Sequence, residues 1–280
     1  METMMEPALL NYFIYNDELK DTCDFNSRFI EKGPGIYEVI RFQDGKPLFL
    51  DEHIRRFFQS AKYEKLPLEL TEEQIRERIK TLIISNRAKQ GNIFFELTIN
   101  PEKGPVFTAW VMPSYYPSKE ELTNGVVIKT MTGARKKPHS KRINLPVRKT
   151  ADKIIQGEHV AEVLMISDSG LVTEGSRSNI FFVKDTALYT PPLKLVLPGI
   201  TRSVIIRLAR ENGIKVFEED IRFDHIQRFD SCFLTSTSRD VLPVRQIDKL
   251  RYSVSSPVIR KLISLFEDMA FEYFLNFSWD

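Results

Sequence analysis

The residues best suited to chemistry lie in a basic stretch, RKKPHSKRIN, which runs from Arg135 to Asn144. Two interpretations of this stretch are open. A run of cations is typical of a nucleic-acid surface, a nuclear-import signal or a solvated loop. A lysine amine can also act as a covalent nucleophile when its pKa falls. The stretch taken alone favours the first interpretation.

Three further segments carry residues that bind anions. Gly199, Ile200 and Thr201 come at the start of a predicted helix, where free N–H groups and the helix dipole attract negative charge. The hydroxyl residues at 235–238 directly follow a predicted strand, which suits a phosphate or an ordinary polar turn. Arg56 lies on another predicted helix and, considered alone, is typical of a surface arginine.

One carboxylate in the second half of the chain also has an informative position. Glu174 lies in a turn rich in Gly and Ser, directly before the apolar stretch IFFV. It is either a solvent-exposed turn residue or a buried partner for a cationic ring. The four histidines are scattered and no zinc, P-loop or nucleophile-elbow motif is present, so the sequence predicts no metal site.

The composition is that of an ordinary globular protein. The 280 residues are 42% hydrophobic and 28% charged, with a formal net charge of +2, which argues against a general polyanion binder. Cys23 and Cys232 are far apart and predict no disulfide scaffold. The first residues include acids where a signal peptide needs cations, and no apolar run could span a bilayer. We therefore expect a cytoplasmic protein that binds neither membranes nor nucleic acid.

Local patterns in the first part of the chain predict strands and two helices. Asp44-Gly45 between two β-rich stretches is a strong hairpin signal. Thr71 and Gln74 form a capping-box pattern that predicts the start of a helix. Another helix is expected over 51–66, with an apolar face made of Ile54, Phe57, Phe58 and Ala61.

The second part of the chain alternates predicted strands with helices. We expect one helix from Thr150 to Glu162, and another from Thr201 that Gly213 stops. A final amphipathic helix is expected near 258–274.

These elements indicate a mixed α/β protein with two domains. A segment rich in Pro and polar residues predicts a linker between them. The expected organisation is an N-terminal α+β domain at 1–115, a linker at 116–124 and a C-terminal α/β domain at 125–280 that contains the basic stretch.

Four motifs, in this order and with this spacing, resemble the class IV aminotransferases: SKRIN, LVTEGSRSNIFFV, YTPPLKLVLPGITR and FLTSTSRDVLPV. The stretch YEVIRFQDGKPLFLDEHIRRF is similar to the family's N-terminal strand, hairpin and helix. The family consists of fold-type IV enzymes that depend on pyridoxal 5'-phosphate. It includes branched-chain aminotransferases, D-amino-acid transaminases and 4-amino-4-deoxychorismate lyase. The resemblance implies a two-domain fold with the cofactor at the domain interface, and a homodimer.

The resemblance also implies roles for individual residues. Lys141, three residues before Asn144, matches the catalytic lysine that forms a Schiff base with the cofactor. It is favoured over its competitors Lys136, Lys137, Lys149 and Lys153, which lack the spacing to the asparagine. Glu174 matches the carboxylate that pairs with the pyridine nitrogen. The other cofactor-binding positions implied are Arg56, Ser178, Asn179, Ile200, Thr201, Ser236 and Thr237.

Four more positions match residues near the substrate or the lysine. Tyr37 matches an aromatic residue on the substrate side, and Arg41 is either a substrate-carboxylate residue or a surface arginine. Glu162 matches a buried acid near the lysine, in a network with an arginine. Arg135 is the candidate for that arginine.

The activity that the resemblance implies is transfer of an amino group between an amino acid and a 2-oxo acid. The N-terminal segment departs from the family's D-R-G and G-D-G turns, with Pro34 in place of the middle acid, and Val39 replaces a glycine of the branched-chain pattern. The segment 97–107 lacks the R-x-H pair of D-amino-acid transaminases, which argues against the standard D-alanine enzyme. Two alternatives remain: a lyase that releases pyruvate from aminodeoxychorismate, and a catalytically silent relative of the same fold.

Overall fold

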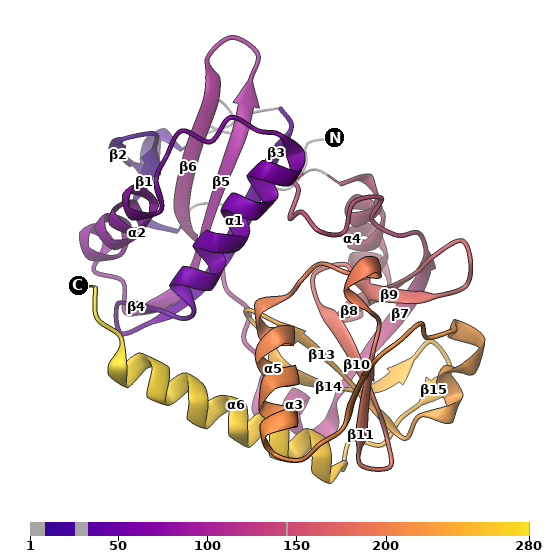
Figure 1. Ribbon diagram of the computed structural model, residues 1–280. Helices are drawn as coiled ribbons and strands as arrows, with labels where there is room; N and C mark the ends of the chain where they lie inside the picture. Colours follow the sequence, from indigo (N-terminus) through magenta and orange to yellow (C-terminus); the bar gives the residue numbers. More distant parts are fainter. Residues whose placement is uncertain (1–8, 26–32, 144, 280) are drawn as a thin grey trace. The chain divides into compact units, whose positions relative to one another are not determined.

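The computed structural model describes residues 9–25, 33–143 and 145–279, and the chain divides into two compact units (Figure 1). Unit 1 consists of Met1–Ser114, Ser140–Asn144 and Ala270–Asp280, and unit 2 of Tyr115–His139 and Leu145–Met269. Both units are therefore discontinuous in sequence, and the short segment with Lys141 clusters with unit 1. The contiguous domain limits expected from the sequence stay a prediction.

Unit 1 is built on a six-stranded antiparallel sheet with the order β2-β1-β6-β5-β3-β4. Its strands are β1 (Leu9–Tyr15), β2 (Glu18–Asp21), β3 (Gly35–Gln43), β4 (Lys46–Pro47), β5 (Gln90–Asn100) and β6 (Gly104–Met112). The predicted hairpin joins β3 to β4, and Asp44 and Gly45 have φ angles of 50° and 75°. Two successive positive φ angles give the turn twist that matches right-handed strands.

Two helices of unit 1, α1 (Leu50–Glu64) and α2 (Glu72–Asn86), pack on this sheet and share one apolar core with it. The predicted apolar face of α1 is confirmed, because Ile54, Phe57 and Ala61 are buried in that core and Phe58 packs against it. The predicted capping box is confirmed as well. The hydroxyl of Thr71 accepts the N–H of Gln74 at 3.1 Å, and the Gln74 side chain accepts the N–H of Thr71 at 2.9 Å.

Unit 2 is built on a nine-stranded mixed sheet with the order β12-β11-β10-β13-β14-β7-β8-β9, in which β15 also pairs with β14. Strand β7 is parallel to both β8 and β14, whereas β10 is antiparallel to β11 and β13. The strands are β7 (Val126–Thr132), β8 (Glu162–Ile166), β9 (Val172–Gly175), β10 (Asn179–Lys184), β11 (Ala187–Thr190), β12 (Val216–Glu218), β13 (Ser231–Ser236), β14 (Asp240–Ile247) and β15 (Leu250–Arg251).

The helices of unit 2 are α3 (Lys119–Asn124), α4 (Pro146–Glu158) and α5 (Ile200–Glu211); α6 (Pro257–Asn276) begins in unit 2, and its residues from Ala270 belong to unit 1. Three short 3-10 turns occur at Thr22–Asp24, Leu193–Leu195 and Phe223–Arg228. The predicted linker contains α3. No helix within the described ranges is both long enough and apolar enough to cross a membrane.

The predicted end of one helix is wrong. The helix expected to reach Glu162 stops at Glu158, and Glu162 is instead the first residue of β8. His159 ends the helix by adopting a left-handed conformation with φ of 52°, which a continuing helix does not allow. The predicted stop of α5 is confirmed, since Gly213 follows its end with φ of 75°.

Asn86, the last residue of α2, ties that helix to β1. Its Oδ1 accepts the N–H groups of Asn11 and Tyr12, both at 2.9 Å, and its Nδ2 donates to the carbonyls of Tyr12 and Leu82. In Asn86→Ala these backbone groups lose their partner. We expect the free energy of unfolding, measured by urea denaturation, to fall by about 1–3 kcal/mol.

Asn276→Ala is the matched control, because the Asn276 side chain makes an exposed bond to the carbonyl of Glu272 within its own helix. We expect that variant to stay within about 0.5 kcal/mol of the parent protein. Equal losses in the two variants would show that Asn86 does not hold β1 to α2.

Candidate active site

Lys141 lies on a short segment that pairs with the start of β3 in unit 1. The N–H of Tyr37 donates to the carbonyl of Lys141 at 2.9 Å, and the N–H of Ile143 donates to the carbonyl of Gly35 at 3.1 Å. This backbone pairing fixes the position of Lys141 beside β3. Asn144, which completes the predicted motif, lies outside the described residues.

The amine of Lys141 belongs to a buried cluster with Glu38, His53 and Arg56, which we call the lysine group. Nζ of Lys141 lies 3.3 Å from Oε2 of Glu38 and 4.9 Å from the centre of the Tyr37 ring. Arg56 donates two hydrogen bonds of 2.7 Å to the two carboxylate oxygens of Glu38. Nδ1 of His53 lies 2.8 Å from Oε2 of the same carboxylate. Glu38 therefore organises the group.

Burial and charge shift the pKa values within the lysine group. Burial lowers the pKa of Lys141, although Glu38 opposes this change. Burial by itself would raise the pKa of Glu38, but Arg56 and Lys141 hold it well below its usual value. Burial lowers the pKa of His53 to about 4. The group thus combines an ionised carboxylate, a neutral imidazole and an amine that loses its proton more readily than usual.

Neither Glu38 nor His53 was among the predicted site residues, although the sequence carries a signal for both. Alternate residues of β3 face the same side of the sheet, so Glu38 shares the core face with the fully buried Ile36 and Ile40. A charged residue at such a position needs a partner. His53 and Arg56 are three residues apart on α1, a spacing that places both on one face of the helix.

The two predicted substrate residues, Tyr37 and Arg41, lie on the opposite face of β3 from Glu38. Tyr37 is buried and stacks on Phe94 with ring centres 5.1 Å apart. Arg41 is half-buried. Their roles toward a substrate stay predictions.

Glu162 is completely buried in unit 2 and is held by two serines and an arginine. Its oxygens accept hydrogen bonds from the hydroxyls of Ser176 at 2.6 Å and Ser178 at 3.0 Å, and from Nη1 of Arg239 at 2.8 Å. Burial would raise the pKa of Glu162, but Arg239 and Ser176 keep it below its usual value. Arg239 is therefore the arginine that bonds Glu162 directly, which corrects the prediction. Nothing local in the sequence indicates a partner 77 residues away. Arg135 reaches this network through Ser176, to whose carbonyl its Nη2 donates at 3.0 Å.

Arg135 instead lies beside Glu174, which is 2% exposed. Nε of Arg135 is 3.0 Å from Oε1 of Glu174, but the two groups are not aligned for a hydrogen bond, and Oε1 has no donor within the described residues. Oε2 of Glu174 accepts the N–H of Leu197 at 3.0 Å. Burial raises the pKa of Glu174, although Arg135 opposes the shift. Glu174 is thus a buried carboxylate with one oxygen that lacks a donor.

Asn179 connects Glu174 to the predicted anion-binding residues. Its Nδ2 donates to the carbonyl of Leu197 at 3.1 Å, and the residue pairs with Thr235 in β13. A Cβ atom at Gly199 would lie only 2.0 Å from Oδ1 of Asn179, so glycine is required directly before α5. The start of α5 and the end of β13 therefore both adjoin Asn179. The predicted anion-binding residues lie at these two chain positions: Ile200 and Thr201 open α5, Ser236 ends β13, and Thr237 follows it.

A known family profile matches most of the chain. The family described as Amino-transferase class IV matches residues 35–247. The chain belongs to the class IV aminotransferases. The D-alanine aminotransferase of Bacillus licheniformis is 34% identical over an alignment of 236 residues, gaps included, that covers 80% of this chain and 83% of that protein. The D-alanine aminotransferase of Listeria monocytogenes serotype 4b (strain F2365) is 30% identical over 283 residues, covering 94% of this chain and 95% of the relative.

Solved structures share the fold. The branched-chain aminotransferase of the thermophilic archaeon Thermoproteus uzoniensis, solved with norvaline, matches with a TM-score of 0.83 and 22% identity, over 94% of this chain and 95% of that one. A Legionella pneumophila protein thought to be a 4-amino-4-deoxychorismate lyase matches with a TM-score of 0.75 and 23% identity, over 87% and 93% of the two chains. The predicted mixed α/β fold of type IV is confirmed.

Membership of this family establishes the class of enzyme. The chain is a class IV aminotransferase, and this class depends on pyridoxal phosphate, as the sequence predicts. The two relatives are named for D-alanine, whereas the segment 97–107 of this chain has neither Arg nor His. That segment forms the end of β5, a turn and the start of β6. The amino donor of this enzyme stays a prediction.

The buried, neutral state of His53 makes stability depend on pH. The unfolded chain binds a proton at this residue below about pH 6.5, whereas the folded protein binds it only near pH 4. The unfolded state therefore binds more protons between these values, and stability falls as the pH is lowered through this window. His53→Asn keeps a donor toward Glu38 and removes the titration. We expect its loss of stability between pH 6.5 and 4.5 to be smaller by about 2 kcal/mol, measured by urea denaturation.

His225→Asn is the control, because the His225 side chain is exposed. It should show the same pH dependence as the parent protein. If His53→Asn also kept the parent's full pH dependence, His53 would not be a buried neutral imidazole.

Proposed function

We propose that this class IV aminotransferase carries pyridoxal phosphate on Lys141 and pairs the pyridine nitrogen of the cofactor with Glu174. The observation that supports this best is the buried Oε1 of Glu174, which lacks a hydrogen-bond donor among the described residues. A protonated ring nitrogen would supply that donor. Its positive charge would also offset the cost of burying the carboxylate. The residues present therefore fit this cofactor.

The phosphate of the cofactor carries close to two negative charges, and unit 2 offers suitable donors for it. The first N–H groups of α5 and the hydroxyl of Thr201 lie at a positive helix end. Ser236 and Thr237 add hydroxyl and backbone donors at the end of β13. Arg56 is the cation that we propose for the same phosphate, with its guanidinium held in position by Glu38.

Lys141 has to act as a nucleophile and then as a base, and both roles need an unprotonated Nζ. Burial shifts its pKa in the required direction, while the ionised Glu38 at 3.3 Å limits the shift. When bound, the cofactor supplies the electron sink that stabilises negative charge on the substrate's α-carbon. Nζ of Lys141 would be the group that accepts the proton from that carbon and holds it for transfer.

The substrates that we propose are an amino acid, the kind of molecule for which the relatives are named, and a 2-oxo acid that receives its amino group. Tyr37 and Arg41 lie on one face of β3 and are the candidates for contacts with the substrate. The family resemblance also predicts a homodimer.

Visible absorption tests the proposed reaction. Protein loaded with pyridoxal phosphate should be yellow, and one member of a panel of L- and D-amino acids should bleach the colour as its amino group is transferred. The amino acid that does so names the donor. Pyruvate released from aminodeoxychorismate, with no bleaching by any amino acid, would make the protein a lyase. Protein that never turned yellow would refute the proposal.

Glu174→Gln tests the role of the carboxylate in the same assay. The variant keeps the size of the side chain and loses its charge, so we expect it to stay yellow but to bleach about 10²-fold more slowly. Glu211→Gln changes an exposed carboxylate of unit 2 and should bleach at the parent rate. A Glu174→Gln protein as fast as the parent would remove Glu174 from the mechanism.

A further inference from the structure

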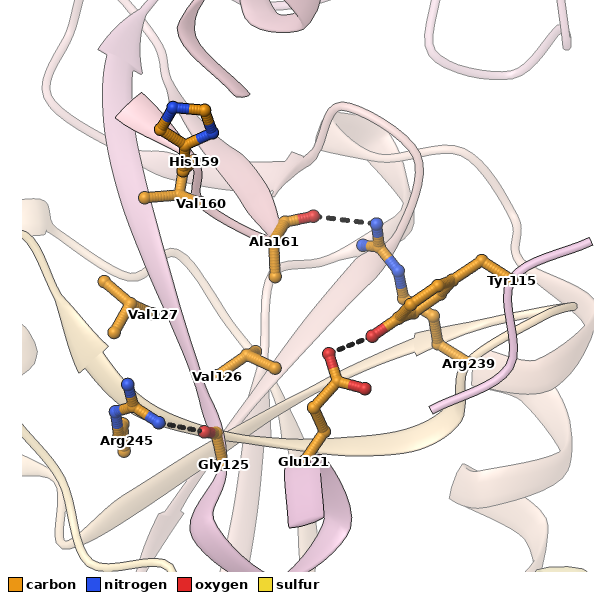
Figure 2. A pocket seen from close by; sticks show the side chains of 10 residues that line it. All are labelled: Tyr115, Glu121, Gly125, Val126, Val127, His159, Val160, Ala161, Arg239 and Arg245. Atoms are coloured by element: carbon orange, nitrogen blue, oxygen red, sulfur yellow. Dashed lines mark hydrogen bonds between the residues drawn. The ribbon is translucent and has the colours of Figure 1, made fainter. Parts of the chain in front are cut away.

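A cavity of about 510 Å³ lies in unit 2 at the amino ends of the parallel strands β7 and β8 (Figure 2). Pockets of this size hold small molecules. Tyr115, α3, the first residues of β7, the stretch before β8 and two arginines, Arg239 and Arg245, line it. None of these residues is among those proposed to hold the cofactor.

The two arginines are fixed in place but keep donors for a ligand. Nη1 of Arg245 donates to the carbonyl of Gly125 at 2.9 Å, and no carboxylate among residues 9–25, 33–143 and 145–279 lies within ion-pair distance of it. Arg239 donates to the carbonyl of Ala161 and to Glu162, both at 2.8 Å. A guanidinium has five N–H groups, so these contacts use only part of its donor capacity. Arg245 in particular is a cation without a carboxylate partner in the described part of the chain.

The carboxylate that lines the pocket, Glu121, is engaged by its own neighbours. Its Oε2 accepts the N–H of Ser118 at 2.9 Å in the cap of α3, and its Oε1 accepts the hydroxyl of Tyr115 (Figure 2). Glu121 keeps its charge in these bonds, but it makes no ion pair with Arg245, so in the described part of the chain Arg245 stays available to an anion.

The rest of the lining is mostly apolar, with His159 as a further polar side chain. In Figure 2, Val126 lies between Arg245 and Arg239. Val127 lies above Arg245, and Val160 lies farther along, beside His159. A ligand that matches this arrangement has a short hydrocarbon chain with a negative group at each end.

We propose that this pocket binds a short organic dicarboxylate, with one carboxylate on Arg245 and the other on Arg239. The inference rests on the proposed function in one respect. Arg239 also holds Glu162, which binds Ser176 and Ser178 next to Glu174, so a ligand on Arg239 would act on the surroundings of the proposed cofactor partner.

Isothermal titration calorimetry with the cofactor-loaded protein tests the pocket without turnover. Glutarate, a five-carbon dicarboxylate without an amino or oxo group, should bind saturably. Butanoate, which has one carboxylate, should bind at least about tenfold more weakly, because it leaves one arginine without a charged partner. Equal affinity for the two acids would refute the dicarboxylate assignment.

Arg245→Gln should weaken glutarate binding by about tenfold or more and leave the yellow colour unchanged. Arg260→Gln, which alters another exposed arginine of unit 2, is the matched control and should bind glutarate like the parent protein. Glutarate binding that is absent, or that is the same in both variants and the parent, would overturn the proposal.

The rate at which the amino donor bleaches the loaded enzyme, measured with and without glutarate, shows whether the natural ligand is part of the substrate or a separate effector. If glutarate raises the KM for the donor and leaves kcat unchanged, the pocket receives part of the substrate. If glutarate changes kcat without competing, it stands in for a separate effector. Suppose that glutarate binding depends on Arg245 but no amino acid bleaches the loaded protein. The ligand site would then be supported and the proposed aminotransferase reaction refuted.

Discussion

Three of the buried carboxylates, Glu38, Glu162 and Glu174, each lie within 3.0 Å of an arginine nitrogen. Moving a carboxylate out of water costs several kcal/mol, and only close cations and hydrogen bonds offset that cost. Much of the local structure follows from this constraint. It accounts for the face of α1 that meets β3, where Arg56 holds Glu38, and for the serine-rich turn after β9 that surrounds Glu162.

Burial acts on the two central residues of the proposed mechanism in opposite senses. For Lys141 it favours the neutral amine, which is the form that attacks and that accepts a proton. For Glu174 it favours the protonated acid, which could not pair with a cationic ring nitrogen. Arg135 opposes that shift, and a positive ligand would oppose it further. Burial thus lowers the pKa of Lys141, and at Glu174 it makes a cationic partner necessary if the carboxylate is to stay ionised.

Features that depend on sequence neighbours could be predicted, and those that depend on distant partners could not. The capping box at Thr71 and the helix stop at Gly213 involve residues within one turn of each other. The Lys141–Glu38 pair spans 103 positions, and a single sequence carries no record of such contacts. The end of α4 was predicted too late because His159, which adopts a left-handed conformation, is not a typical stop residue. Motif resemblance supplied candidate roles, but it did not supply the arginine that holds each carboxylate.

Reductive trapping shows whether the amine of Lys141 carries the cofactor. Borohydride converts the bond between cofactor and lysine into a stable amine, and peptide mass spectrometry then locates the added mass. We expect one modified residue per chain, at Lys141. Modification at Lys136, Lys137, Lys149 or Lys153 instead, or no modification of the loaded protein, would contradict this expectation.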